Sequence, residues 1–480
     1  MTHLKFLILL SFAFLFTLNV FSQDTSYYQQ IRDRIKIDST ERLHVSSIHI
    51  SGNKKTKTYI ILREIPFKQG DYLSISHLID TLLQAKYQVH NINLFSEVSV
   101  TPMITETHEL IIYITVREKW YIYPTPQFQL TDRNFNDWIK TYNADFNRVV
   151  YGVKFAHYNF SGRGDQLRVY LLNGYARNFS FSYNAPYSNS KLTEGFRISG
   201  SYTQNREFAY KTTYGNKLLL YKRTGFVRSS FFGSLSYQAR KGFFKRSIYS
   251  ITYGYIDLAE KIKDPVFYPY YFNSNKSYAS FFDLSYTYIY SNTNNVNYPL
   301  KGKVYGFTAL KRGFGIKGDV NMFSLTGLYS IYLPHRKKWY SSFQVLTKAI
   351  LPFKQPYINQ RSIGYSEFYL RGQEYYVIDG VAAAVAKYTL KKKLVEFKMH
   401  MPFHIKAVPY IPFTFYGKAY TDAGYSYIKD QFKTRLNNRF LYTGGFGLDI
   451  LTLYDVNFSL EYSFNQLGES GLFLHAKGGF

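Results

Sequence analysis

Hydrophobic and polar residues alternate along most of the chain after residue 120. The alternation comes in runs of about ten residues that are bounded by clusters of Gly, Asn, Ser or Pro. A period of two puts successive side chains on opposite faces of a strand, so each run predicts a strand with one apolar and one polar face. Helical spacing is not sustained anywhere in this region. The clearest runs are residues 149–158, 166–172, 196–202, 280–290, 303–310, 342–350 and 456–462.

Residues 43–119 have a different pattern, in which helical spacing lies between alternating runs. The turn sequence Ser51-Gly52-Asn53 ends the first run, and Ser76 is placed to cap the longer helix. Such a β-α-α-β-β order predicts a compact α+β unit whose helices cover one face of a sheet. The predicted elements are a strand at 43–50, helices at 56–63 and 76–89, and strands at 95–101 and 110–116.

The N-terminus has the features of an export signal. Lys5 precedes a mostly apolar run at 6–21, and Val20-Phe21-Ser22 offers compact residues where a signal peptidase reads. We therefore expect a signal peptide at 1–22 and a polar linker at 23–42. An uncleaved anchor is the alternative, although the run is short for a crossing of roughly 20 residues.

Composition narrows the fold class. Aromatic residues make up 20% of the chain, with 49 Tyr and 42 Phe, and this excess is typical of strands and of the aromatic girdles of membrane barrels. No later run of 18 apolar residues is free of charge, which excludes membrane-spanning helices but not a β-barrel. At about 22 residues for each strand and its connection, residues 120–480 hold about 16 strands. A soluble β-sandwich or propeller is the alternative.

Charge and cysteine content exclude other classes. The net charge of +27 would suit nucleic acid, but alternating strands in an exported chain favour anionic lipid head groups or a basic lumen. No nucleic-acid partner is therefore predicted. Because the chain has no cysteine, neither disulfides nor a cysteine zinc cluster is expected.

Several motifs together resemble the BamA/TamA/FhaC superfamily of outer-membrane β-barrels. The turn Asn159-Phe160-Ser161-Gly162-Arg163-Gly164-Asp165 is similar to the family's N-L-F-G-R-G-D turn, although its glycines are explained equally well by a tight hairpin. Leu370-Arg371-Gly372 resembles the (V/L)-R-G-(F/Y) plug-loop motif, with Gln373 in place of the aromatic. Tyr420-Thr421-Asp422-Ala423-Gly424 resembles the F-x-D-x-G strand. The region 43–119 resembles a POTRA domain through Ile50-Ser51-Gly52-Asn53, Asn93-Leu94-Phe95-Ser96-Glu97-Val98 and Ile112-Tyr113-Ile114-Thr115-Val116-Arg117-Glu118.

The resemblance implies an α+β POTRA-like domain at 43–119 in the periplasm, followed by a transmembrane antiparallel β-barrel at 120–480. A plug loop at about 355–379 would enter the lumen, where Arg371 would meet Asp422. Alternation puts Asp422 and Gly424 on one face of their strand, and a charge in a narrow lumen is tolerated mainly when it is paired. The alternative is that Asp422 caps a turn in solvent.

Two strands carry further expectations. The final run puts Leu472, Leu474, Ala476 and Phe480 on one face and His475 and Lys477 on the other, and this run resembles the terminal signal by which barrel proteins are recognised. In the POTRA-like domain, Phe95, Val98 and Val100 mark a strand whose exposed edge would accept an extended client segment. The alternative there is a rigid spacer.

No catalytic residue, metal site or cofactor is predicted. The G-x-G-x-x-G sequence at 313–318 precedes no helix, and Pro402 between His400 and His404 argues against a helical metal site. A membrane-embedded hydrolase stays open, because no motif excludes it.

The resemblance implies a non-enzymatic outer-membrane factor that assists insertion or translocation of client proteins. A dedicated secretion pore and a passive channel are the alternatives. The family's assembly factors and its secretion pores typically carry more than one POTRA-like unit, whereas one is visible here. Expected partners are outer-membrane lipid and lipopolysaccharide, unfolded or exported clients, and accessory subunits.

Overall fold

The computed structural model describes residues 31, 33, 38–130, 143, 145–259, 267–314, 320–365, 368–400, 409–429 and 434–478. The predicted signal peptide and most of the predicted linker lie outside these residues. Phe480 lies outside them as well. No helix in the described ranges is long and apolar enough to cross a membrane.

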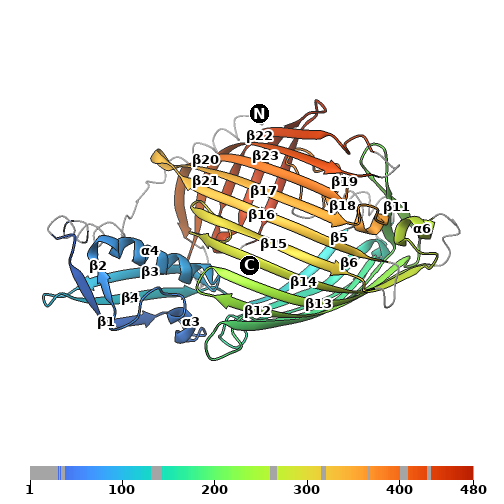
Figure 1. Cartoon of the computed structure of the whole chain (residues 1–480). Helices are drawn as coiled ribbons and strands as arrows, with labels where there is room; N and C mark the ends of the chain where they lie inside the picture. The colour runs from blue at the N-terminus through green and yellow to red at the C-terminus, as the bar shows by residue number, and fades with distance from the viewer. Residues whose placement is uncertain are drawn as a thin grey trace.

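The first domain is a four-stranded sheet covered by helix α4 (Figure 1). The strand order is β2-β1-β4-β3, in which β1 and β4 run parallel and the other neighbours antiparallel. The order β-α-α-β-β is confirmed with one addition, because β2 is too short to show alternation. The elements are β1 (Arg42–Ser51), α3 (Thr58–Leu62), β2 (Tyr72–Ser74), α4 (Ile75–Asn91), β3 (Phe95–Ile104) and β4 (Glu109–Glu118).

The core of this domain lies between α4 and the sheet. Leu78 and Leu82 of α4 are fully buried against strand residues such as Ile112. Phe95, Val98 and Val100 also belong to this core, so strand addition at this edge would use backbone groups and not these side chains. The strand that carries them, β3, is nevertheless an edge of the sheet. Ile31, from the predicted linker, lies in the same core.

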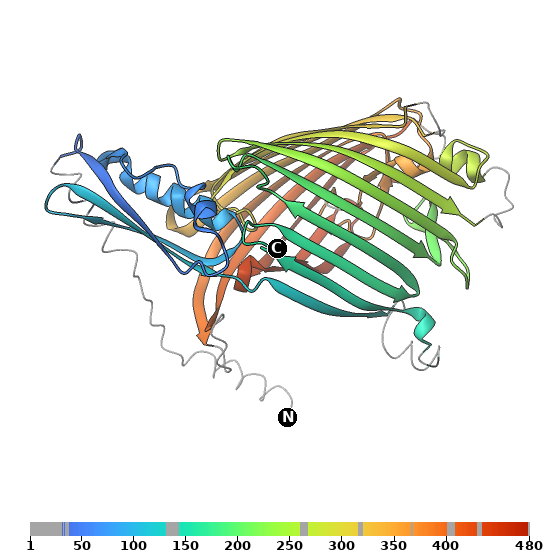
Figure 2. The same ribbon diagram turned by 90° about the horizontal axis from the view of Figure 1, so that it is seen from below.

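The second domain is a 16-stranded antiparallel sheet, which agrees with the predicted number. It curls into a barrel beside the first domain (Figures 1 and 2). Its strands, in sheet order, are β5 (Ile122–Leu130), β6 (Val149–Tyr158), β7 (Gln166–Gly174), β8 (Ala176–Ala185), β9 (Glu194–Asn205), β12 (Arg228–Lys241), β13 (Lys245–Leu258), β14 (Tyr278–Thr293), β15 (Gly302–Arg312), β16 (Met322–Pro334), β17 (Trp339–Leu351), β20 (Ala382–His400), β21 (Tyr410–Tyr427), β22 (Phe440–Leu451), β23 (Asn457–Asn465) and β24 (Ser470–Lys477).

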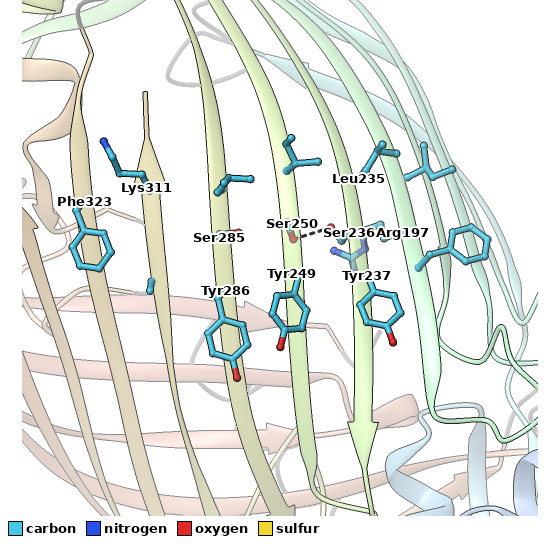
Figure 3. Close-up of a pocket in the computed structure, with 15 residues that line it drawn as sticks. Arg197, Leu235, Ser236, Tyr237, Tyr249, Ser250, Ser285, Tyr286, Lys311 and Phe323 are labelled. Atoms are coloured by element: carbon cyan, nitrogen blue, oxygen red, sulfur yellow. Dashed lines mark hydrogen bonds between the residues drawn. The ribbon is translucent and has the colours of Figure 1, made fainter. Parts of the chain in front are cut away.

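The outer wall of the barrel is apolar. Along β14, Phe282 and Leu284 are exposed, whereas Asp283 between them is buried. On three neighbouring strands, Tyr237, Tyr249 and Tyr286 form a row at one level of the outer wall (Figure 3), with ring centroids 6.3 and 4.9 Å apart. They line a shallow groove of about 680 Å³ on this wall. Exposed apolar side chains with an aromatic row are typical of a lipid-facing surface.

Short elements lie at the two ends of the barrel. We call the end beside the first domain the proximal end, and the other the distal end. The distal end carries β11 and α6 (Figure 1), and the loop between β17 and β20 holds the two-stranded sheet of β18 and β19. The remaining elements are η1 (Phe146–Arg148), β10 (Glu207–Thr212), β11 (Leu218–Lys222), α6 (Phe267–Phe272), η2 (Arg336–Lys338), η3 (Tyr357–Asn359), β18 (Arg361–Ile363), β19 (Ile378–Asp379) and η4 (Leu453–Asp455).

Candidate functional site

The long connection from β17 to β20 is anchored on the inner wall, and its Leu370-Arg371-Gly372 motif makes the main contacts. Leu370 is fully buried and lies against Gly424 of β21. A Cβ at Gly424 would stand 3.0 Å from Leu370 Cδ1. The absent side chain at Gly424 is therefore what lets the loop approach this strand.

Arg371 is paired with Asp422, as the family resemblance implies. Its Nε donates to Asp422 Oδ2 at 2.9 Å, and its Nη2 donates to Oδ1. The backbone N–H of Arg371 also donates to Oδ2, at 3.0 Å. Asp422 is 1% exposed, so it is a buried wall residue and not a solvent-facing turn cap. A bidentate, charge-assisted pair of this kind fixes both distance and orientation.

Three further wall residues complete the anchor. Arg371 Nη1 donates to Thr389 Oγ1 at 2.9 Å, and its guanidinium lies 4.0 Å from the ring centroid of Tyr420. The Tyr420 hydroxyl and Ser463 Oγ are 2.6 Å apart. A Cβ at Gly445 would stand 2.6 Å from that hydroxyl. Gly445 of β22 therefore makes room for the ring of Tyr420 under Arg371.

Gly372 takes a conformation that side chains disfavour, with φ of +88°. Its carbonyl accepts a hydrogen bond at 3.0 Å from Nδ2 of Asn465, the last residue of β23. Gln373, which replaces the family's aromatic, is 2% exposed, and its Nε2 donates to Gln466 Oε1 at 2.9 Å. Leu370, Arg371 and Gly372 thus all contact β21 or β23, two of the last strands of the barrel wall.

A second ionic cluster lies on the same inner wall, and no sequence motif predicts it. Lys418 contacts both Asp449 and Glu461, and Lys391 lies 3.0 Å from Asp449 Oδ2. The hydroxyl of Tyr298 donates to Asp449 Oδ2 at 2.8 Å. Alternation along β20 to β23 assigns these residues to the inner face, but partner choice depends on the register between strands.

The first domain is fixed to the proximal end of the barrel by a buried ion pair. Both guanidinium Nη atoms of Arg240 lie 2.5 Å from the carboxylate oxygens of Glu64, which is 2% exposed. The hydroxyl of Tyr187 donates to Glu64 Oε1 at 3.0 Å. Because Glu64 follows α3 and Arg240 ends β12, the pair holds the two domains in one orientation.

The turn between β6 and β7 is a second contact with the first domain. Lys57 N–H donates to the carbonyl of Gly162 at 2.9 Å, and a Cβ at Gly162 would stand 2.4 Å from the carbonyl oxygen of Lys55. Both Gly162 and Gly164 have positive φ. Asp165 closes the turn by accepting from Ser161 N–H at 2.8 Å and from the hydroxyl of Tyr183 at 3.0 Å. Half-buried Arg163 lies between the two glycines.

The C-terminal end of α4 makes a third contact, with the turn between β22 and β23. His90 Nε2 lies 3.1 Å from Asp455 Oδ2, and Asn295 Nδ2 donates to Asp455 Oδ1 at 3.0 Å. Burial alone would raise the pKa of Asp455, but the hydrogen bond and charge of His90, with the charge of Lys119, outweigh it and lower the pKa to about 2. The carboxylate is therefore charged at neutral pH.

At the distal end, the hairpin of β10 and β11 folds onto the plug loop. Its tip residue Asn216 is fully buried; its carbonyl accepts from Val377 N–H at 2.9 Å, and its Nδ2 donates to Thr434 Oγ1 at 2.7 Å. Leu436 N–H donates to Asn216 Oδ1 at 3.0 Å. Asn216 thus joins the hairpin to two segments. Its side chain binds the loop after β21, and its backbone carbonyl binds the plug loop.

The first and last strands of the sheet are unpaired with each other. Within residues 122–130 and 470–477 no ladder hydrogen bond joins β5 to β24. On β24, Leu472 and Leu474 are exposed at 62% and 72%, Ala476 is exposed on the same side, and His475 points to the lumen side. The predicted alternation of the terminal strand therefore agrees with the structure up to Ala476, whereas Lys477 is exposed as well.

These features define a β-barrel that follows an N-terminal α+β domain, with a loop anchored on the inner wall and with first and last strands that do not pair within the described residues. The POTRA family model (surface antigen variable number repeat) matches residues 43–119, and the Omp85 superfamily domain matches residues 159–453. Because the second match covers more than half of the chain, the protein belongs to the Omp85 superfamily of outer-membrane insertion and translocation proteins.

Two solved structures share this fold. BamA from Haemophilus ducreyi lacking POTRA domains 1-3 has a TM-score of 0.50 at 15% identity, covering 92% of this chain and 85% of that one. CdiB from Escherichia coli has a TM-score of 0.50 at 11% identity, covering 90% and 75%. At these identities the likeness concerns the fold alone. No curated protein matches the sequence.

Proposed function

We propose that this protein assists insertion of client proteins into the outer membrane through the seam between β5 and β24. The observation that carries the proposal is that these two strands do not pair within the described residues. An unpaired edge in hydrocarbon costs several kcal/mol for each unsatisfied backbone group, so a client strand that pairs with it is stabilised there. The seam is thus a template for an incoming strand.

The contacts that anchor the plug loop favour a lateral route over a route through the pore. Arg371 and Asp422 hold the plug loop on the wall, and the Asn216 hairpin covers it from the distal end. Passage through the lumen would require both sets of contacts to break. Opening at the seam requires neither.

The first domain lies in the periplasm in this proposal, and the edge of β3 receives extended client segments. The backbone from Val98 onward is at the sheet edge, with Pro102 as a position that has no N–H to offer. Since Val98 and Val100 point into the core, recognition would use the other face of the strand, where Met103 is 45% exposed. Protease added to intact cells should spare residues 43–119; their digestion would contradict this placement.

The proposal assigns no catalytic role to any residue, and its partners are client proteins, with accessory subunits where the client requires them. Outer-membrane lipid and lipopolysaccharide would contact the apolar outer wall. A dedicated translocation pore is the second candidate, and membership of the Omp85 superfamily is compatible with it. The pore hypothesis requires the plug loop to leave the lumen, whereas the seam hypothesis does not.

Tethering the seam distinguishes the two candidates. The chain has no cysteine, so introduced pairs are the sole thiols. Single cysteines along residues 122–130 are combined with single cysteines along 470–477, and pairs that oxidise are reconstituted into vesicles with an unfolded barrel protein as client. We expect oxidation to block client insertion and reduction to restore it.

The matched control is a pair across an intact ladder. Thr287 and Thr308 face each other on β14 and β15, with their hydroxyl oxygens 2.9 Å apart, so a Thr287→Cys/Thr308→Cys disulfide leaves the seam free. This variant should insert clients in both redox states. Full activity of the tethered seam would reject the lateral route and favour the pore.

A further inference from the structure

Three potential metal ligands converge where the plug loop meets the last two strands. They are Glu374 of the plug loop, Glu461 of β23 and His475 of β24. His475 Nε2 lies 3.3 Å from Glu374 Oε1 and 3.5 Å from Glu461 Oε2, and all three atoms lie within 4.8 Å of one another. The three residues come from separate segments, so the chain fold and not a local motif brings them together.

The three atoms do not hydrogen-bond to one another. Each is buried, and none has a hydrogen-bond partner within the described residues. A protonated imidazole that paired with a carboxylate would donate at about 2.7–2.9 Å. In tetrahedral Zn²⁺ sites, bonds of about 2.0–2.1 Å place neighbouring ligand atoms about 3.3–3.4 Å apart. The two distances from His475 Nε2 match this second spacing.

The other oxygen of each carboxylate is already held. Glu374 Oε2 accepts from Gly372 N–H at 2.8 Å, and Glu461 Oε1 contacts Lys418 Nζ. These contacts fix both carboxylates so that their free oxygens, Glu374 Oε1 and Glu461 Oε2, face His475. Glu461 is 3% exposed, and an unpartnered carboxylate oxygen at that burial is costly without a cation.

The surrounding charges leave room for a cation. Lys391 and Lys418 are positive, whereas Asp449, Glu461 and Glu374 are negative, so one negative charge remains when His475 is neutral. The ion pair of Arg371 and Asp422 cancels within itself. Neutral imidazole with two carboxylates is a donor set that suits Zn²⁺, and a fourth position would be left for water.

We propose that Glu374 Oε1, Glu461 Oε2 and His475 Nε2 bind a divalent transition-metal ion, with Zn²⁺ as the best-fitting ion. Bound there, the ion joins the plug loop to β23 and to the strand that forms one edge of the seam. No sequence pattern indicates the site, because Glu374 is remote in sequence from the other two ligands and the ligand spacing is irregular. The inference does not depend on the proposed function, and its test needs no client.

The test uses the full chain without a polyhistidine tag, folded in detergent, stripped of metal and then equilibrated with Zn²⁺. We expect one tightly bound equivalent by elemental analysis after gel filtration, and a higher unfolding temperature with Zn²⁺ than with chelator, because a ligand that binds only the folded state stabilises it. Co²⁺ in place of Zn²⁺ should give the visible absorption of a tetrahedral site.

Two variants and one control assign the ligands. His475→Gln and Glu374→Gln should each lose the bound equivalent and the Zn²⁺-dependent rise, while heat-modifiable gel mobility shows that the barrel is folded. His77→Gln changes an exposed histidine on α4 and should bind like the wild type. Absence of bound metal in the wild type, or retention of it by the two variants, would overturn the proposal and leave a protonated His475 between the carboxylates.

Discussion

At the residue scale, the plug loop is held by complementary residues of the loop and the wall. Leu370 fits against Gly424, and Arg371 pairs with Asp422 over the ring of Tyr420. A buried charge that loses its partner is left uncompensated. Separately, the absence of a Cβ at Gly424 leaves the space that Leu370 of the loop occupies. Charge and shape therefore make separate predictions.

Removing one member of the ion pair should destabilise the barrel. Arg371→Ala and Asp422→Ala should each cost roughly 3–5 kcal/mol, since the remaining charge stays buried. The double variant should cost less than the sum of the two, because the residues are in contact. Unfolding temperature by heat-modifiable mobility and channel conductance in planar bilayers measure the two effects.

Glu64→Ala is the matched control for that cycle. It removes one partner of a buried ion pair at the proximal end, away from the plug loop. Combined with Arg371→Ala it should give an additive loss, because distant sites without shared partners are independent. Additivity of Arg371→Ala with Asp422→Ala would show that the pair does not hold the plug loop.

A side chain at Gly424 should displace the loop without any change of charge. Gly424→Val brings its Cβ to 3.0 Å from Leu370 Cδ1, and overpacking of this kind costs about 1–3 kcal/mol. Conductance should rise, and Leu370→Ala in the same chain should partly restore the closed state. Gly225→Val is the control, because nothing lies within 4 Å of an added Cβ there. Equal conductance of the Gly424 and Gly225 variants would contradict the close fit.

At the element scale, α3, α4 and the proximal turns of the barrel form one polar interface. Glu64 after α3 pairs with Arg240, and the end of α4 binds the turn that carries Asp455. Two hydrogen bonds extend this interface: Asn91 Nδ2 donates to the carbonyl of Thr293 at the end of β14, and Asn93 Oδ1 accepts from Asn297 Nδ2 in the turn between β14 and β15. The first domain should therefore move with the barrel as one body as long as these groups stay charged.

Acid should weaken this interface in a defined window. The pKa of Asp455 is lowered from 3.8 to about 2, so its contribution is complete above pH 4 and is lost as pH falls through 2. The shift corresponds to about 2 kcal/mol. Asp455→Asn should remove this part of the acid dependence, measured as the difference between the two chains in domain undocking by limited proteolysis from pH 5 to pH 2. Identical acid profiles would mean that the carboxylate contributes nothing to docking.

The elements also show what the sequence could predict. Alternation predicted strands and the inward face of β21, because the side-chain period of a strand is fixed by the backbone, whereas the number sixteen came from the length of the region at about 22 residues per strand. The cap of α4 was placed at Ser76, whereas the structure has it at Ser74, since the intervening residues also suit a helix start. Pairs such as Glu64 with Arg240 depend on how two domains meet, and no local pattern encodes that.

Resemblance and alternation differed in what they supplied for the site. The pairing of Arg371 with Asp422 came from family motifs, and alternation supported only the inward direction of the acid. The edge position of the strand that carries Phe95, Val98 and Val100 was predicted, and the structure adds that their side chains are buried in the core of the first domain. His475 was assigned to the face opposite Leu474, yet its partner Glu374 could not be foreseen.

At the scale of the whole molecule, contacts inside the barrel contrast with the edges of its sheet. The plug loop is anchored on the inner wall and joined to the Asn216 hairpin, while β5 and β24 share no ladder in the described residues. The first domain is fixed to the proximal end, and β3 is one edge of its sheet. This arrangement suits a client that enters the membrane sideways.

Site-specific photocrosslinking in growing cells tests this claim most directly. A photoreactive residue is placed at Phe128 of β5 or Leu472 of β24, both exposed near the seam, and at Phe282 on β14 as a lipid-facing control away from it. The account predicts adducts with newly made outer-membrane barrel proteins at the two seam positions and none at Phe282. Adducts of equal yield at all three positions, or the absence of client adducts at the seam, would contradict it.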